Sequence, residues 1–291
     1  MDTMDKTKVH ALISLLDDPN EMIFSSVEEQ LLKEEIGVVD ELEKAWEVSC
    51  DDVFQKRVEN IIHTLQLNDV KSSMAKWINE GGQDLFYGAF LVAKYQYPEL
   101  NYDVLNEKVN KLQRDVWLEL NDHLTAIEKV RIINHIMFDV HKYVRNSTHF
   151  FAPQNSYINE VMDTKKGNPI SLCIIYSVVA QRLGLPIYGV NLPKNFVLCY
   201  LDENIHPYSI VEYKDNVMFY INPVNKGAIL GRKEIEYFIK QQKLNHVPSY
   251  FNPCSNLDTI KRVLFNLSYA YNNEGNELKK EEILQLLQLF R

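Results

Sequence analysis

A helix start followed by an almost wholly apolar segment is the feature that most constrains the fold of this chain. Gly167-Asn168-Pro169 supplies an N-cap residue and a proline at the first helical position, where a missing N–H has little cost. The following residues, 170–183, are apolar on nearly every side, and Gly184 predicts a left-handed helix end. Such a helix has no face to expose to water. We therefore expect it to be buried among other elements.

The segments around this helix predict an α+β fold. Four short runs rich in Val, Ile, Tyr and Phe indicate strands, and Asp215-Asn216 predicts a hairpin between the last two; the runs are 187–191, 196–201, 209–213 and 217–221. Helical periodicity without a fixed repeat dominates both flanks. We expect an N-terminal helical region over 1–145, an α+β core over 146–245 and a C-terminal helical tail over 246–291.

Composition limits the classes of function. The 291 residues are 46% hydrophobic and carry a formal net charge of −9, which argues against disorder and against nucleic-acid binding. Four Cys lie far apart without a CxxC pair, so we expect reduced thiols, no metal site and no cofactor. No apolar run approaches the ~18 residues that a bilayer requires, and the first 20 residues do not contain the long apolar segment that is typical of a signal peptide. We expect a cytoplasmic protein that binds no membrane.

Three motifs, in this order, resemble one family. They read NSYINEVMDTKKGNPISL from Asn155, YSVVAQRLGLPIYGVNLPKNFVL from Tyr176 and FYINPVNKG from Phe219. The SirB-type branch of the transglutaminase-like superfamily is similar, with segments that read approximately NSYLxxVLxxRxGxPISL, RLGLPxxGVNFPGHFLL and FIDPFNGG. The resemblance covers about residues 130–245. It implies a papain- or transglutaminase-like core, in which a buried helix packs against a small antiparallel sheet.

The resemblance also implies that the usual catalytic residues have been replaced. Active relatives place a Cys at the helix start, a His on a strand and an Asp on the next strand. The matching positions hold Ser171, Asn195 and Asn222. An Asn side chain does not titrate near neutral pH, so Asn195 cannot serve as a general base. We therefore expect no catalytic residues at this vestigial triad.

Other residues nevertheless leave a route to catalysis open. Cys173 lies just inside the apolar helix, and it is either a displaced nucleophile or a small buried core residue. His149 and His206 are the candidates for a substitute base, provided that one of them reaches the helix start. A thiol-class amidase, protease or acyltransferase that uses Cys173 is thus one alternative function.

The favoured hypothesis is a degenerate site that acts as a binding or regulatory module. Amide side chains both donate and accept hydrogen bonds, which suits the backbone of an unknown peptide or protein partner. A second alternative function is a helical scaffold for protein–protein interaction, with a purely structural core. For Asn155 and Asn191 the alternative to a place in the cleft is that they are ordinary strand-end or turn residues. The residues expected to line the cleft are Asn155, Tyr157, Asn168, Asn191, Asn195 and Asn222.

Overall fold

The computed structural model describes residues 6–34, 36–202 and 216–290. It divides the chain into two compact units, residues 1–75 and residues 76–291, which we call the N-terminal unit and the core unit. The division falls inside one long helix, α4 (Asp52–Asn79). The boundaries at 145 and 245 stay predictions.

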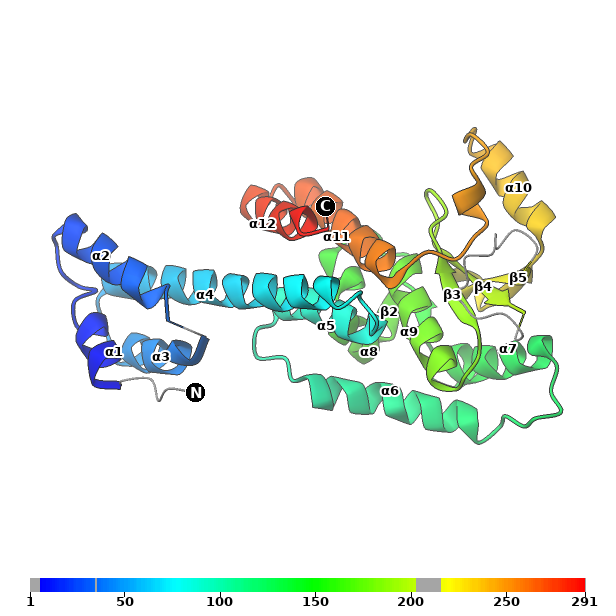
Figure 1. Ribbon diagram of the computed structural model, residues 1–291, viewed down its shortest axis with the longest axis horizontal. Coiled ribbons are helices and arrows are strands. Elements are labelled where there is room, and N and C mark those ends of the chain that lie inside the picture. Colours follow the sequence, from blue (N-terminus) through cyan, green and yellow to red (C-terminus); the bar gives the residue numbers. More distant parts are fainter. Residues whose placement is uncertain (1–5, 35, 203–215, 291) are drawn as a thin grey trace. The chain divides into compact units, whose positions relative to one another are not determined.

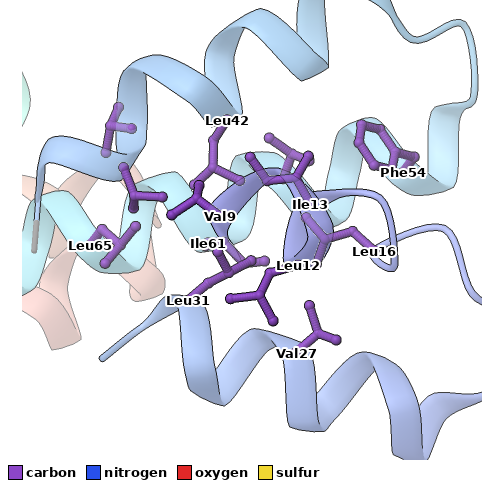
Figure 2. Packing of buried hydrophobic residues seen from close by; sticks show 13 residues of the cluster. Val9, Leu12, Ile13, Leu16, Val27, Leu31, Leu42, Phe54, Ile61 and Leu65 are labelled. Carbon is purple, nitrogen blue, oxygen red and sulfur yellow. The ribbon is translucent and has the colours of Figure 1, made fainter. Parts of the chain in front are cut away.

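The N-terminal unit is a small helical assembly around an aliphatic core. Leu16, Leu31, Leu42 and Ile61 are completely buried there, and Figure 2 shows side chains from successive helices meeting in this cluster. Polar caps begin the helices locally: the Asn20 side chain accepts the Met22 N–H at 3.0 Å. Its elements are α1 (Lys6–Ile13), α2 (Glu21–Leu31), a 3₁₀ turn (Ile36–Val38), α3 (Val39–Val48) and most of α4.

The core unit is built around one buried helix, α9 (Pro169–Arg182). Every residue from Ile170 to Ala180 is buried, and Gly184 has a φ of +75° just after the helix, as expected. Figure 1 shows α9 beside the sheet. The other helices of the unit are α5 (Leu85–Gln96), α6 (Tyr102–Trp117), α7 (Ala126–Asn134) with a π-helical extension (His135–Val140), α8 (Ile158–Thr164), α10 (Arg232–Gln241), α11 (Asn256–Glu274) and α12 (Glu277–Gln288).

The described residues of the core also form a four-stranded antiparallel sheet, in the order β3-β4-β5-β6. All five residues of β4 are buried, because side chains of alternate residues point to opposite faces and both faces are covered. Val197, Cys199 and Leu201 pack with Ile235 and Ile239 of α10. The strands are β3 (Ile187–Val190), β4 (Val197–Leu201), β5 (Val217–Asn222) and β6 (Ala228–Leu230).

The sheet differs from the expectation in one strand. The sequence pattern did not predict β6, which pairs with β5 through Tyr220↔Leu230 and Ile221↔Ile229. The expected strand over 209–213 and Asp215 of the expected hairpin lie outside the described residues.

The fold class is α+β with helical flanks, as the sequence predicts. None of the helices described within 6–34, 36–202 and 216–290 combines the length and apolarity that crossing a bilayer requires.

Two short strands and a 3₁₀ turn position the segment that precedes α9. β1 (Val144–Arg145) pairs in parallel with β2 (Lys166–Gly167), and the 3₁₀ turn Pro153–Ser156 lies between them in the chain. This pairing brings the segment 146–157 next to the start of α9. The segment 146–157 is one of the four parts of the chain that form the candidate site.

Candidate functional site

A cavity of about 180 Å³ lies at the N-terminus of α9, and we call it the cleft. Its walls come from the 146–157 segment, the first turn of α9, the connection between β3 and β4, and α11. The described residues that line it are Phe150, Phe151, Ala152, Ser156, Asn168, Pro169, Ile170, Lys194, Asn195, Phe196, Arg262, Asn266, Tyr269 and Ala270. The site is therefore where the resemblance places a catalytic centre.

The start of α9 is closed by a capping box. The Asn168 Oδ1 accepts the Ser171 N–H at 3.0 Å, and the Ser171 Oγ accepts the Asn168 N–H at 3.0 Å. The Ser171 hydroxyl also donates to the Asn168 carbonyl at 3.1 Å. A Cβ on Gly167 would lie 2.5 Å from the Ser171 Oγ, so this approach requires glycine. Ser171 is thus engaged with backbone and is not among the described lining residues, whereas Asn168 is.

The structure places Asn195 and Asn222, the two other positions that we expect to belong to a vestigial triad, in different surroundings. Asn195 lines the cleft, and its side chain makes no hydrogen bond to any described residue, so its amide is free for a ligand. Asn222 ends β5 and lies outside the described lining. Its Oδ1 is buried without a hydrogen-bond partner among the described residues. The strand register pairs Leu198 with Ile221, so Asn222 lies where β4 begins.

Asn155 and Asn191 support the cleft from behind its wall. The Asn155 Nδ2 donates to the carbonyls of His149 at 2.6 Å and Phe150 at 3.0 Å, which holds the loop that carries the cleft phenylalanines. The Asn191 Oδ1 accepts the Arg262 Nη1–H at 3.2 Å. Neither side chain is among the described lining residues, because each amide is turned toward a neighbouring part of the protein.

Tyr157 points away from the cleft. Its hydroxyl lies 2.6 Å from the Tyr271 hydroxyl, and its ring packs edge-on against Tyr97 with 5.6 Å between centroids. Burial raises the pKa of the Tyr157 hydroxyl above its usual value. Tyr157 is therefore part of a buried tyrosine cluster, and it neither lines nor fills the cavity.

Cys173 lies in the core. The residue is completely buried, and its Sγ donates to the Phe196 carbonyl at 3.4 Å. Burial raises the pKa of the thiol well above its usual value, which disfavours the reactive thiolate. His149 is exposed and absent from the described lining, while His206 lies outside the described residues.

Both charged side chains of the described lining are cationic. They are Lys194, which is exposed, and Arg262, which is partly buried on α11. Neither forms an ion pair with a described residue, and burial lowers the pKa of Arg262. No Asp or Glu is among the described residues that line the cleft. The described part of the chain contains no group of three His, Cys, Asp or Glu that could hold a metal ion.

Aromatic rings form the mouth of the cleft. Phe150 and Phe151 lie 4.9 Å apart in an edge-to-face pair, and Phe151 lies 5.9 Å from Tyr269 of α11. Phe151 and Tyr269 are each 57% exposed. The sequence pattern did not predict that Phe150, Phe151 and Tyr269 line the cleft, and it did not predict Arg262 or Asn266 there. The one local signal for this site was the pair of consecutive phenylalanines in a polar, turn-rich loop. No local feature of the sequence indicated that the α11 residues line a cavity.

Comparison with known proteins agrees with this architecture. A family model described as the transglutaminase-like superfamily matches residues 103–265. The UPF0162 protein of Xylella fastidiosa (strain 9a5c) is 28% identical over 191 residues, which cover 64% of this chain and 64% of that protein. F-box only protein 21 of Mus musculus is 30% identical over 161 residues, 54% of this chain and 24% of that protein. The chain thus spans less than two thirds of either relative.

No solved structure matches the chain. The assignment depends on the family model, which covers more than half of the sequence and includes the helix start, the sheet and the first part of α11. The two bacterial UPF0162 relatives from Xylella fastidiosa support it at 28% and 27% identity. The chain belongs to the transglutaminase-like superfamily.

Proposed function

We propose that this protein is a non-catalytic member of its family and that the cleft binds a segment of a peptide or protein partner. The observation that carries the proposal is the composition of the cleft. The cavity lies at the first turn of α9, where a nucleophile would be presented, yet its described lining contains no thiol and no imidazole. Amide, cationic and aromatic side chains occupy that wall instead.

Acyl transfer by a thiol needs an accessible nucleophile and a base that activates it. Cys173 is buried behind the wall, and the Asn195 amide cannot accept a proton from it. Loss of a triad member alone lowers the rate by about 10⁴-fold or more. The burial of the thiol and the absence of a base at Asn195 together support a binding role.

The buried Asn222 oxygen supports the same proposal. In a working triad an acidic side chain at this strand position orients the histidine by accepting its ring N–H. Here the acceptor persists as an amide, but the residue at the histidine position is Asn195, and the Asn222 Oδ1 has no partner among the described residues. An acceptor that has lost its donor is consistent with a site that no longer maintains catalytic geometry.

The cleft retains features that suit a peptide. The Asn195 and Asn266 side chains line it without hydrogen bonds to described residues, so their amides can both donate to and accept from a peptide backbone. Phe265, one turn before Tyr269 on α11, is 52% exposed and extends the aromatic surface beyond the mouth. Exposed aromatic side chains next to free amides are typical of binding sites for protein segments.

The test is selection from a phage-displayed library of peptides with free C-termini, on three full-length variants. Asn266→Trp places an indole in the cleft, whereas Asn272→Trp places the same group on an exposed position of α11 outside the described lining. We expect peptides enriched on the wild type to be lost with Asn266→Trp and retained with Asn272→Trp. Cys173→Ala should keep the enrichment, because the thiol does not face the cleft.

Two results would overturn the proposal. Equal enrichment on the two tryptophan variants would place binding elsewhere on the protein. Cleavage of bound peptides by the wild type, abolished by Cys173→Ala, would restore the thiol-enzyme alternative. A thermal melt of each variant shows whether the loss of binding reflects the cleft or loss of the fold.

A further inference from the structure

The charge of the cleft indicates which part of a peptide it takes, an inference that depends on the proposed binding function. Arg262 and Lys194 carry the charges among the described lining residues, and no carboxylate balances them there. The N-terminal end of α9 adds a partial positive charge. An anionic group is therefore the complementary ligand.

Arg262 carries a positive charge that is partly buried and that has no carboxylate partner among the described residues. Its hydrogen-bond partner among the described residues is the neutral Asn191 oxygen at 3.2 Å. The nearest acid along α11 is Asp258, one turn earlier, but its carboxylate accepts the Ser255 hydroxyl at 2.7 Å in another capping box. Charges that lose water are normally paired. A ligand carboxylate would supply the missing partner and can accept two hydrogen bonds from a guanidinium.

The size and the walls of the cavity restrict the rest of the ligand. A volume of about 180 Å³ is below the range of about 300–1,000 Å³ that encloses a drug-sized molecule, so the cleft holds roughly one amino-acid residue. The apolar part of its wall comes from Ile170, Phe196 and the aromatic mouth. The occupant must therefore present a carboxylate and an apolar side chain within one residue.

We propose that the cleft captures the C-terminal end of a partner peptide whose last residue is apolar or aromatic. A chain end carries both required groups on a single residue, and capture of a terminal carboxylate is a recurring mode of peptide recognition. The carboxylate lies against Arg262, with the Asn195 and Asn266 amides beside it. The last side chain packs against Phe196 and the aromatic mouth.

Three small probes separate the possible sources of the carboxylate. N-acetylphenylalanine presents a chain-end carboxylate with an aromatic side chain. N-acetylphenylalanine amide is the same molecule without the charge, and N-acetylaspartic acid α-amide carries a side-chain carboxylate instead. Saturation-transfer difference NMR on the full-length protein, with each probe at up to about 10 mM, covers dissociation constants in the millimolar range.

We expect N-acetylphenylalanine to bind and the two other probes to bind at least about tenfold more weakly. Arg262→Gln should weaken binding of N-acetylphenylalanine by about tenfold or more, and Arg262→Lys by less, because it keeps the charge without the planar fork. Lys261→Gln is the matched control: it removes one positive charge from the same helix outside the described lining and should change little. Thermal melts establish that each variant is folded.

Each other outcome has a defined meaning. Equal binding of the acid and its amide, both lost with Asn266→Trp, would overturn chain-end recognition and leave the proposed cleft function standing. Binding of the aspartyl probe as strong as that of N-acetylphenylalanine would assign the site to acidic side chains and overturn the proposal. Absence of binding by all three probes would also overturn it, while the library selection independently decides the proposed function.

Discussion

The two units of this protein differ sharply in charge. Residues 1–75 contain 17 Asp and Glu against seven Lys and Arg, a net charge of −10, whereas residues 76–291 contain 23 against 24, a net charge of +1. The whole-chain value of −9 therefore describes the N-terminal unit and not the core unit. The cleft lies in the nearly neutral unit and has a cationic lining. The net charge of the whole chain therefore does not reveal that the cleft has a cationic lining.

The units also differ in what they bury. Among the described residues, every buried polar or charged side chain lies in the core unit, and several of them surround the cleft, including Asn155, Ser156, Asn168 and Ser171. The N-terminal unit buries apolar side chains and pairs its charges at the surface, as in Lys33 and Glu29. A buried polar group needs a specific partner, so it restricts local geometry far more than an aliphatic contact does.

The largest contrast that we predict is between two cysteines. Cys50 in the N-terminal unit is exposed, whereas Cys173 is completely buried and its pKa is raised by burial. A raised pKa leaves the thiol protonated at any pH below it. Iodoacetamide at pH 7 to 9, followed by peptide mass spectrometry, should label Cys50 more than about 100-fold faster than Cys173. Comparable rates at pH 7 would mean that Cys173 is accessible and reactive.

A pair of glycine substitutions compares backbone packing in the two units. Gly167→Ala introduces a Cβ 2.5 Å from the Ser171 Oγ and 2.9 Å from the Val161 Cγ1, and we expect a loss of about 1–3 kcal/mol in the free energy of unfolding. Gly37→Ala in the N-terminal unit meets no heavy atom within 4 Å, so its effect should be about 1 kcal/mol at most. Hydrogen exchange read by mass spectrometry reports each unit separately. Equal effects would show that the capping box tolerates displacement.

The smallest predicted contrast concerns two asparagine caps. Asn168 is buried and also donates to the Ser156 hydroxyl at 2.9 Å, whereas Asn20 caps α2 in an exposed position. We expect Asn168→Ala to lower the free energy of unfolding by about 1–2 kcal/mol and Asn20→Ala by about 0.5 kcal/mol. The same hydrogen-exchange measurement resolves the two. A larger loss at Asn20 would contradict the view that buried polar groups organise the cleft.

Much of the fold could be predicted because its signals are local. The cap at Asn168, the apolar run of α9 and the glycine after it are consecutive in sequence, and β3, β4 and β5 alternate or run apolar within a few residues. β6 has three residues, and only its pairing with β5 makes it a strand. The unit division lies within α4, and no Pro or Gly interrupts this helix to mark it in the sequence.

The candidate site was only partly predictable. Asn168 and Asn195 line the cleft, as expected, because they belong to the helix start and to the β3–β4 connection, and these two segments form walls of the cavity. Tyr157 is adjacent to that motif in sequence, yet its side chain turns toward Tyr271. Arg262 enters from α11, far along the chain, with no neighbouring residue that indicates its role. Sequence adjacency says little about which way a side chain points.

The sequence by itself determined the family and the buried helix with its capped start, and it predicts that Asn195 and Asn222 stand at the histidine and acid positions. These depend on residue identity and short-range order. The tertiary structure alone decided that Ser171 faces backbone, that Asn155 and Asn191 support the wall, and that Arg262 lines the cleft. Side-chain direction is set by packing between elements distant in the chain, and the sum of those contacts is not encoded at any one position.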